Sequence, residues 1–190
     1  ILNPVPPEVA NTPWLRNPID KFILARLEAA KMKPAQVASR RTLIRRAYFD
    51  LIGLPPSPES VAAFVVGDMT WDHVIEELLA SPQYGERWAR HWMDVARYSD
   101  GLGGFLDNRG LPNAWQYRDF VVHAFNEDVP FDQFVRWQIA GELTPNAPLL
   151  ARAGTGFFAV GPTYNVDVGD AEASAAARAE TLSDRVDTFS

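Results

Sequence analysis

Residues 82–98 read PQYGERWARHWMDVARY, and this stretch decides the fold class because its side chains repeat with the period of an α-helix. At 100° per residue, one face is apolar and aromatic and carries Tyr84, Trp88, Trp92 and Val95. The neighbouring stripe is polar and carries Arg87, His91, Asp94 and Tyr98. A serine followed by a proline, Ser81-Pro82, is typical of a helix start. The sequence therefore predicts an amphipathic helix that runs to about residue 98.

The same start and stop signals recur outward from this helix along most of the chain. A capping residue or a proline marks further helix starts at Asn17, Ser57, Thr70, Asn113 and Pro130. Glycines suited to helix ends follow at Gly53, Gly67 and Gly141. Strand patterns are nearly absent, and no internal repeat is found. We therefore expect an all-α fold, a compact bundle of about six to seven short helices, with two long irregular loops at residues 99–112 and 144–169.

The first 16 residues differ in composition from the rest and are rich in proline. They show no helical period, so we expect an extended arm whose docking residues are Pro4, Pro6, Pro7 and Trp14. Residues 17–190 are expected to form a single helical domain. The chain starts at Ile1 rather than Met, and we therefore expect the domain to be part of a longer chain.

Composition excludes several function classes. The formal net charge of −6 and the pI of about 5.0 argue against nucleic acid as a partner, since phosphate binding needs a basic surface. Zero cysteine excludes disulfides, thiol catalysis and a covalently attached c-type haem within these residues. No apolar run approaches the roughly 18 residues of a membrane span, so we expect no transmembrane segment in this chain.

The helix over residues 82–98 and the glycine-rich loop after it supply the candidate site. Two readings of its aromatic face are open: a packed core, or a platform for a sugar ring or a haem wall. His91 borders the polar stripe, and Asp94 one turn on could orient its ring. The candidate ligand or partner surface comprises Trp88, His91, Trp92, Asp94, Arg97, Asp100, Arg118 and Asp119. No metal-ligand motif and no catalytic constellation can be assigned, so whether the chain is an enzyme stays open.

Four long runs carry a family resemblance. They are NPIDKFILARLE (residues 17–28), RRTLIRRAYFDLIGLPPSPE (40–59), YGERWARHWMDVARYSD (84–100) and PNAWQYRDFVVHAFNEDVPFDQFVRWQIAGEL (112–143). Together they resemble the domain of unknown function that precedes the haem-binding segment in planctomycete-type cytochrome c proteins. The resemblance extends from about Asn17 to the end of the chain.

In that family a stretch like DRVDT (residues 184–188) is followed by a CxxCH haem-attachment motif, which this chain lacks. The resemblance thus implies a covalent haem c in a downstream segment, protein partners or a downstream haem domain, and a periplasmic or cell-surface location. The resemblance implies no enzymatic activity, because the family has no established one. We expect a non-catalytic helical module of an exported cytochrome-c-type or electron-transfer assembly. The alternatives are an accessory subunit on the periplasmic side of a membrane complex and a polysaccharide-active enzyme domain, with a groove between the Trp88/Trp92 helix and residues 100–119.

Overall fold

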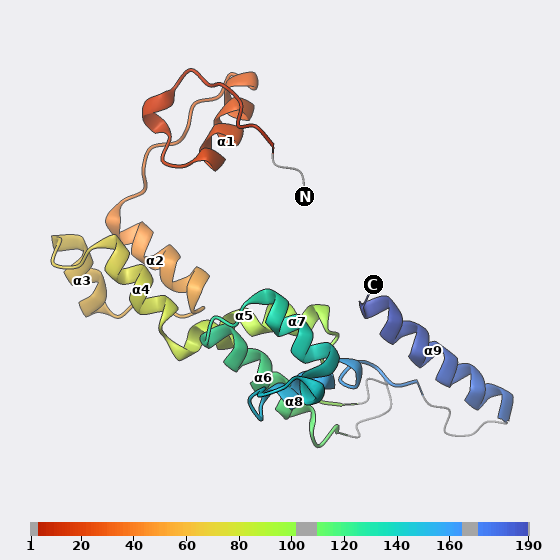
Figure 1. Cartoon of the computed structure of the whole chain (residues 1–190). Helices are drawn as coiled ribbons and strands as arrows, with labels where there is room; N and C mark the ends of the chain where they lie inside the picture. The colour runs from red at the N-terminus through yellow and green to blue at the C-terminus, as the bar shows by residue number, and fades with distance from the viewer. Residues whose placement is uncertain (1–3, 102–109, 165–170, 190) are drawn as a thin grey trace. The chain divides into compact units, whose positions relative to one another are not determined.

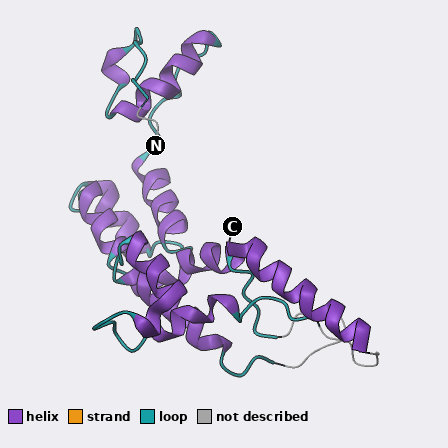
Figure 2. Cartoon of the chain, turned by 45° about the vertical axis from the view of Figure 1, so that its right-hand side comes forward, coloured by secondary structure: helices purple, strands orange, loops and turns teal. Residues whose placement is uncertain are grey.

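The computed structural model describes residues 4–101, 110–164 and 171–189, and in this part of the chain helices are joined by loops (Figures 1 and 2). Its only strand-like feature is a single bridge between Gly101 and Gly110. The α-helices are α1 (Pro18–Ala29), α2 (Arg40–Leu51), α3 (Pro58–Val66), α4 (Trp71–Leu79), α5 (Pro82–Val95), α6 (Ala114–Asn126), α7 (Phe131–Ala140), α8 (Ala151–Gly154) and α9 (Ala171–Phe189). The all-α prediction is confirmed, and the nine described helices slightly exceed the expected six to seven.

Short 3₁₀ segments complete the described elements: η1 (Thr12–Trp14), η2 (Gly141–Leu143) and η3 (Thr155–Phe158). Helix α8 and η3 lie inside the stretch 144–169 that the sequence predicts to be irregular. Neither is long enough to show a hydrophobic period, because α8 spans four residues. The expected second loop is therefore partly helical.

The chain divides into two units, Ile1–Ser39 and Arg40–Ser190. In the first unit, Asn17 caps α1 as predicted: its side chain accepts from the backbone N–H groups of Ile19 and Asp20. The Asp20 carboxylate accepts in return from the Asn17 N–H at 3.1 Å, which completes a capping box. The extended stretch is tied to the same helix, because the Glu28 carboxylate accepts from the Ala10 and Asn11 N–H groups at 3.1 Å each.

The second unit begins with a small core between α2, α3 and α4. Its buried side chains are Ile44, Ala47, Tyr48, Phe64, Val74 and Leu78. Arg40, at the start of α2, lies over the Phe64 ring at 4.0 Å and donates from Nε to the Phe64 carbonyl at 2.6 Å. The predicted caps Ser57 and Thr70 accept the backbone N–H groups of Ser60 and His73, so α3 and α4 start where local rules place them.

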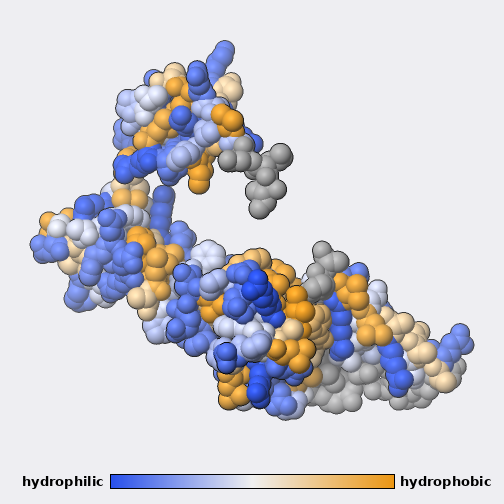
Figure 3. Space-filling view, viewed as in Figure 1, coloured by the Kyte–Doolittle hydropathy of each residue, from blue (hydrophilic) through white to orange (hydrophobic). Residues whose placement is uncertain are grey.

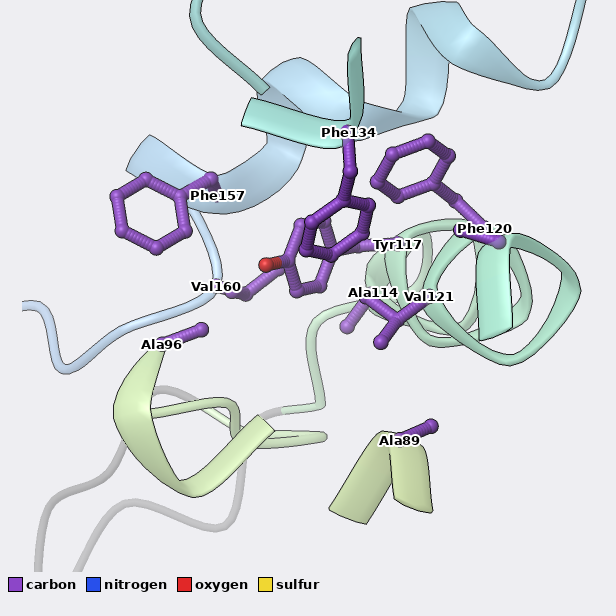
Figure 4. Close-up of a cluster of buried hydrophobic side chains, with 10 residues drawn as sticks. Ala89, Ala96, Ala114, Tyr117, Phe120, Val121, Phe134, Phe157 and Val160 are labelled. Carbon is purple, nitrogen blue, oxygen red and sulfur yellow. The ribbon is translucent and has the colours of Figure 1, made fainter. Parts of the chain in front are cut away.

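A larger core lies between α5, α6, α7 and η3 (Figure 4). The Phe120 and Phe134 rings stack at 5.5 Å, with Tyr117 beside them. A buried polar network crosses this core: Gln138 Oε1 accepts from the Tyr117 hydroxyl at 2.7 Å and from Trp92 Nε1 at 2.9 Å. Because each polar group has a partner, the network adds specificity without an unsatisfied donor.

Helix α5 approaches α6 closely at a glycine. A Cβ on Gly85 would lie 2.5 Å from the Val122 carbonyl oxygen, so the contact requires that position to lack a side chain. The Gly85 N–H also donates to Asn126 Oδ1 at 2.8 Å, and Asn126 Nδ2 donates to the Pro82 carbonyl at 3.1 Å. The start of α5 is therefore fixed on the end of α6.

The end of α5 comes at Val95, earlier than the predicted residue 98. Arg97 adopts a left-handed conformation with φ of 52°, and its N–H donates to the Asp94 carbonyl at 3.2 Å. The Tyr98 N–H donates to the Met93 carbonyl at 2.9 Å, which completes a Schellman motif. The sequence offers no glycine at this position, so the usual helix-stop signal is missing.

Polar contacts link helix α9 to other parts of its unit. Asp184 pairs with Arg97, and Thr181 Oγ1 accepts the Tyr164 N–H at 3.0 Å. The apolar side chains Leu182 and Val186, one turn apart, are 61% and 64% exposed. Among the described residues, no helix combines the length and the apolar character needed to cross a membrane.

Candidate functional site

The eight residues predicted for the site lie in four different environments. Trp92 belongs to the core, because its indole N–H donates into the Gln138 network and its ring packs edge-on against Phe134 at 4.9 Å. Trp88 is half-buried and lies beside His91, with ring centroids 5.4 Å apart. The two tryptophans therefore face different neighbours rather than one shared ligand surface.

The polar stripe of α5 forms the first part of the candidate site, a hollow of about 350 Å³. Its lining residues are Arg87, Arg90, His91, Met93, Asp94 and Tyr98. Of these, Arg90, His91 and Asp94 are exposed, and all three stand on a helix whose opposite face is packed in the core. We refer to this feature below as the α5 hollow.

The Arg87 side chain lies between the α5 hollow and the residues that follow α2. It is partly buried, and its Nε atom is shielded from solvent with no hydrogen-bond partner in the described structure. Its Cδ packs on Gly53, a residue with φ of +75° at the end of α2. The shape of the α2 terminus therefore places this guanidinium group, and a buried donor without a partner calls for a specific explanation.

Tyr98, Asp100, Arg118 and Asp119 form a second polar group at the end of α5. The Tyr98 hydroxyl donates to Asp100 Oδ1 at 2.6 Å. Arg118, on α6, lies 3.9 Å from Asp100 and 3.3 Å from Asp119. The pKa of Tyr98 is raised to about 12 from its ordinary value of 10.0. Partial burial is the larger cause, and the hydrogen bond to Asp100 is the second. Tyr98 therefore stays protonated and donates throughout the neutral range.

Arg97 has a different role from its neighbours on α5. Its guanidinium group pairs with Asp184 of α9 and also reaches the Asp184 carbonyl at 3.3 Å. It thus connects the end of α5 to α9 rather than lining the α5 hollow.

The predicted docking arm lies within the first unit. Trp14 is half-buried in η1, Pro6 and Pro7 are partly buried, and Pro4 is exposed. Next to Pro4, the Val5 side chain is 88% exposed. Part of the glycine-rich loop, residues 102–109, lies outside the described residues.

Arg87 and Arg90 line the α5 hollow but are not among the eight predicted site residues, although the sequence places Arg87 on the polar stripe. Their spacing with His91 and Asp94, at i, i+3, i+4 and i+7, is the signal that places all four on one helix face. A second hollow of about 360 Å³ was also not predicted; it is lined largely by aromatic side chains, among them Tyr84, Trp92 and Phe131. Phe131 is 69% exposed, and hydrophobic side chains gather over α7 in the space-filling view (Figure 3).

The side chains that could bind a metal or a haem limit which cofactors these residues could hold. Within residues 4–101, 110–164 and 171–189, no group of three or more His, Cys, Asp or Glu side chains lies close enough to bind a metal ion. The whole sequence has no cysteine, so the thioether bonds of a c-type haem cannot form within this chain.

Comparison with known protein families shows which family the chain belongs to. No curated protein and no solved structure matches the chain. The family model PSCyt2, described as a protein of unknown function (DUF1549), matches residues 18–190. This range covers α1 through α9 and hence both parts of the candidate site. The predicted resemblance to a domain of unknown function is confirmed, and the chain belongs to the PSCyt2 family.

Proposed function

We propose that this chain is a non-catalytic helical module of an exported cytochrome-c-type or electron-transfer assembly, and that it binds a protein partner through the α5 hollow. The haem, the exported location and the partner come from the family resemblance of the sequence. The α5 hollow supports the proposal by offering a surface suited to docking.

The observation that carries the proposal is the position of exposed charges on a rigid helix. Arg90, His91 and Asp94 are exposed, while Ala89 on the same helix is fully buried and Gly85 is fixed against α6. Because the helix backbone is already ordered, a partner that binds these side chains need not order the chain that carries them. Charged groups at such a surface steer association and set specificity.

The neighbouring acids favour binding over catalysis. Asp100 accepts from Tyr98, and Asp119 pairs with Arg118. A general base or nucleophile must be aimed at a substrate, whereas these two carboxylates are held by Tyr98 and Arg118 in a polar network at the end of α5.

Charge reversal on α5 tests the proposal in the native protein. In the cells that produce the protein, the wild-type sequence is replaced by the Arg90→Glu variant. The variant is then purified under mild conditions together with its bound partners. We expect the variant to lose a partner that the wild-type protein retains. Arg136→Glu is the matched control, since Arg136 is an exposed α7 arginine paired with Asp132. Retention of every partner by Arg90→Glu would overturn the proposal.

An accessory subunit docked through its N-terminal arm is the second candidate. Val5, exposed over 88% of its surface beside Pro4, favours it because an apolar side chain in an extended segment gains burial only on a partner. Deleting residues 1–9 should then abolish assembly, whereas the α5 proposal expects assembly to survive this deletion.

A further inference from the structure

We propose that the α5 hollow recognises an oxyanion, that is a phosphate, sulfate or carboxylate group, held between Arg87, Arg90 and His91. The inference rests on the proposed function, because it names the chemistry by which that surface would recognise its partner. It concerns one anionic group rather than a whole ligand.

The donors in the α5 hollow match this chemistry. Arg87, Arg90 and His91 occupy positions i, i+3 and i+4 of one helix, so they project from one face. Each guanidinium group offers five N–H donors, and an imidazole offers at least one. Arginine forks fit the paired oxygens of carboxylate and phosphate groups. The volume of about 350 Å³ is ample for one such group.

The charge of the α5 hollow is opposite to that of the chain. Its lining has two arginines and one histidine against a single acid, Asp94, whereas the whole chain carries a net charge of −6. Within the described residues, Arg87, Arg90 and His91 form no ion pair. Two arginines three positions apart on a helix repel each other, and a bound anion removes that repulsion. Asp94 lies one turn beyond Arg90, which places the anion toward Arg87.

The arrangement is also preorganised. The Arg87 side chain packs against Gly53, and the Trp88 and His91 ring centroids lie 5.4 Å apart. Arg87 Nε is already removed from water without a hydrogen-bond partner in the described structure, so part of the desolvation cost of binding is met before the anion arrives. A bound oxyanion can reach the outer nitrogens of the same guanidinium group.

The test is an NMR titration of the purified ¹⁵N-labelled protein with sodium phosphate and, separately, with sodium acetate. Chloride is exchanged to keep the ionic strength constant, because surface charge effects vary with salt. We expect saturable shifts at the amides of α5 and at the Trp88 indole, with a dissociation constant of about 1 mM for the better anion. Tighter binding of phosphate identifies a tetrahedral group, and tighter binding of acetate identifies a carboxylate.

Variants decide whether the binding belongs to this site. Arg90→Gln should weaken it at least about tenfold, the loss expected for a charge-assisted bond. Arg90 is exposed, so this variant keeps its fold, and Arg87→Gln provides a second measurement. Arg136→Gln removes the same charge on α7 and should bind as the wild type does. Linear shifts without saturation, or equal affinity in Arg90→Gln, would overturn the anion site.

The two proposals can fail separately. Saturable phosphate or acetate binding that Arg90→Gln abolishes, with partner retention unchanged in Arg90→Glu, supports the anion site and removes the proposed docking function. Loss of the partner in Arg90→Glu, without saturable anion binding, removes the anion site and leaves docking through other contacts.

Discussion

The Arg87 side chain packs on Gly53, so closely that a Cβ at Gly53 would come within 2.9 Å of Arg87 Cδ. Gly53 has φ of +75° just after α2, and Arg87 stands on α5, so one glycine links the end of one helix to the α5 hollow on another. The lining of the hollow therefore depends on a residue outside it.

Gly53→Ala is expected to affect both stability and anion binding. The left-handed backbone costs about 1 kcal/mol for a residue with a Cβ, and the new methyl group pushes Arg87 from its place. Unfolding in urea measures the first effect, and the phosphate titration measures the second. Gly67→Ala is the matched control, because Gly67 has φ of +98° but no atom lies within 4 Å of the place its new methyl group would take. It should lose similar stability and keep full anion affinity; equal affinity in both variants would refute the link.

Gln138 is predicted to be the most sensitive member of the buried network. Gln138→Met removes the acceptor of the Tyr117 hydroxyl and one of the two acceptors of Trp92 Nε1, which also donates to the Tyr117 oxygen at 3.1 Å. The unsatisfied Tyr117 donor should lower the free energy of unfolding by about 2–3 kcal/mol. Tyr117→Phe removes one donor and leaves the Trp92 bond to Gln138, so its cost should be smaller, about 1–2 kcal/mol. Gln116→Met, at an exposed position on α6, should stay within about 0.5 kcal/mol of the wild type. The reverse order for Gln138 and Tyr117 would contradict this account.

Gly85→Ala should be strongly destabilising. Its methyl group would meet the Val122 carbonyl oxygen at 2.5 Å, and this atom belongs to the α6 backbone, so α5 and α6 must separate. Overpacking of this kind costs about 1–3 kcal/mol or more. Gly110→Ala provides the comparison, since the nearest atom to its methyl group would be 3.7 Å away. Equal melting temperatures of the two variants would show that the helices do not meet as described.

The ion pair between Arg97 and Asp184 should restrain α9 without contributing much to global stability. Arg97 is 39% exposed, and pairs of this exposure contribute about 1 kcal/mol at most. Asp184→Asn and Arg97→Ala should each speed hydrogen exchange in α9, and the double variant should add little to either. Exchange in α9 that stays at the wild-type rate in all three would argue against the contact.

Tyr98 gives a prediction about alkaline pH. Its pKa of about 12 in the folded protein lies above the ordinary value of 10.0, so the folded state holds the phenolic proton more tightly. This contribution to stability is complete below pH 10 and is lost as the pH rises from about 10 to about 12. A ¹³C-tyrosine NMR titration, with the Tyr98 signal assigned by its absence in Tyr98→Phe, should find Tyr98 protonated at pH 10.5. Half-ionisation near pH 10 would contradict the partial burial of Tyr98 together with its hydrogen bond to Asp100.

Local rules predicted the helix starts well, because the cause lies within a few residues. Asn17, Ser57 and Thr70 each accept backbone N–H groups two or three positions on, and the sequence shows this directly. The end of α5 was missed because Arg97 takes the left-handed position that usually goes to glycine. The role of Gly85 could not be predicted for a different reason: the residue that it contacts, Val122, lies on another helix.

The candidate site was predicted in outline and not in detail. Helical spacing placed His91 and Asp94 on one polar face, and the α5 hollow contains both. The same spacing could not place Trp92, because its hydrogen-bond partner Gln138 lies 46 positions away in the sequence. It also placed Arg87 on the polar face, but it could not show that Arg87 packs on Gly53, because that contact joins two helices.

The most direct test of the central claim is a gentle purification of the native protein from the cells that produce it, followed by intact mass and visible absorption of the purified species. The account predicts that this chain's sequence is recovered in a species with c-type haem absorption bands, either in one polypeptide or in a stable complex. A single protein with no chromophore and no partner would contradict a role in an electron-transfer assembly.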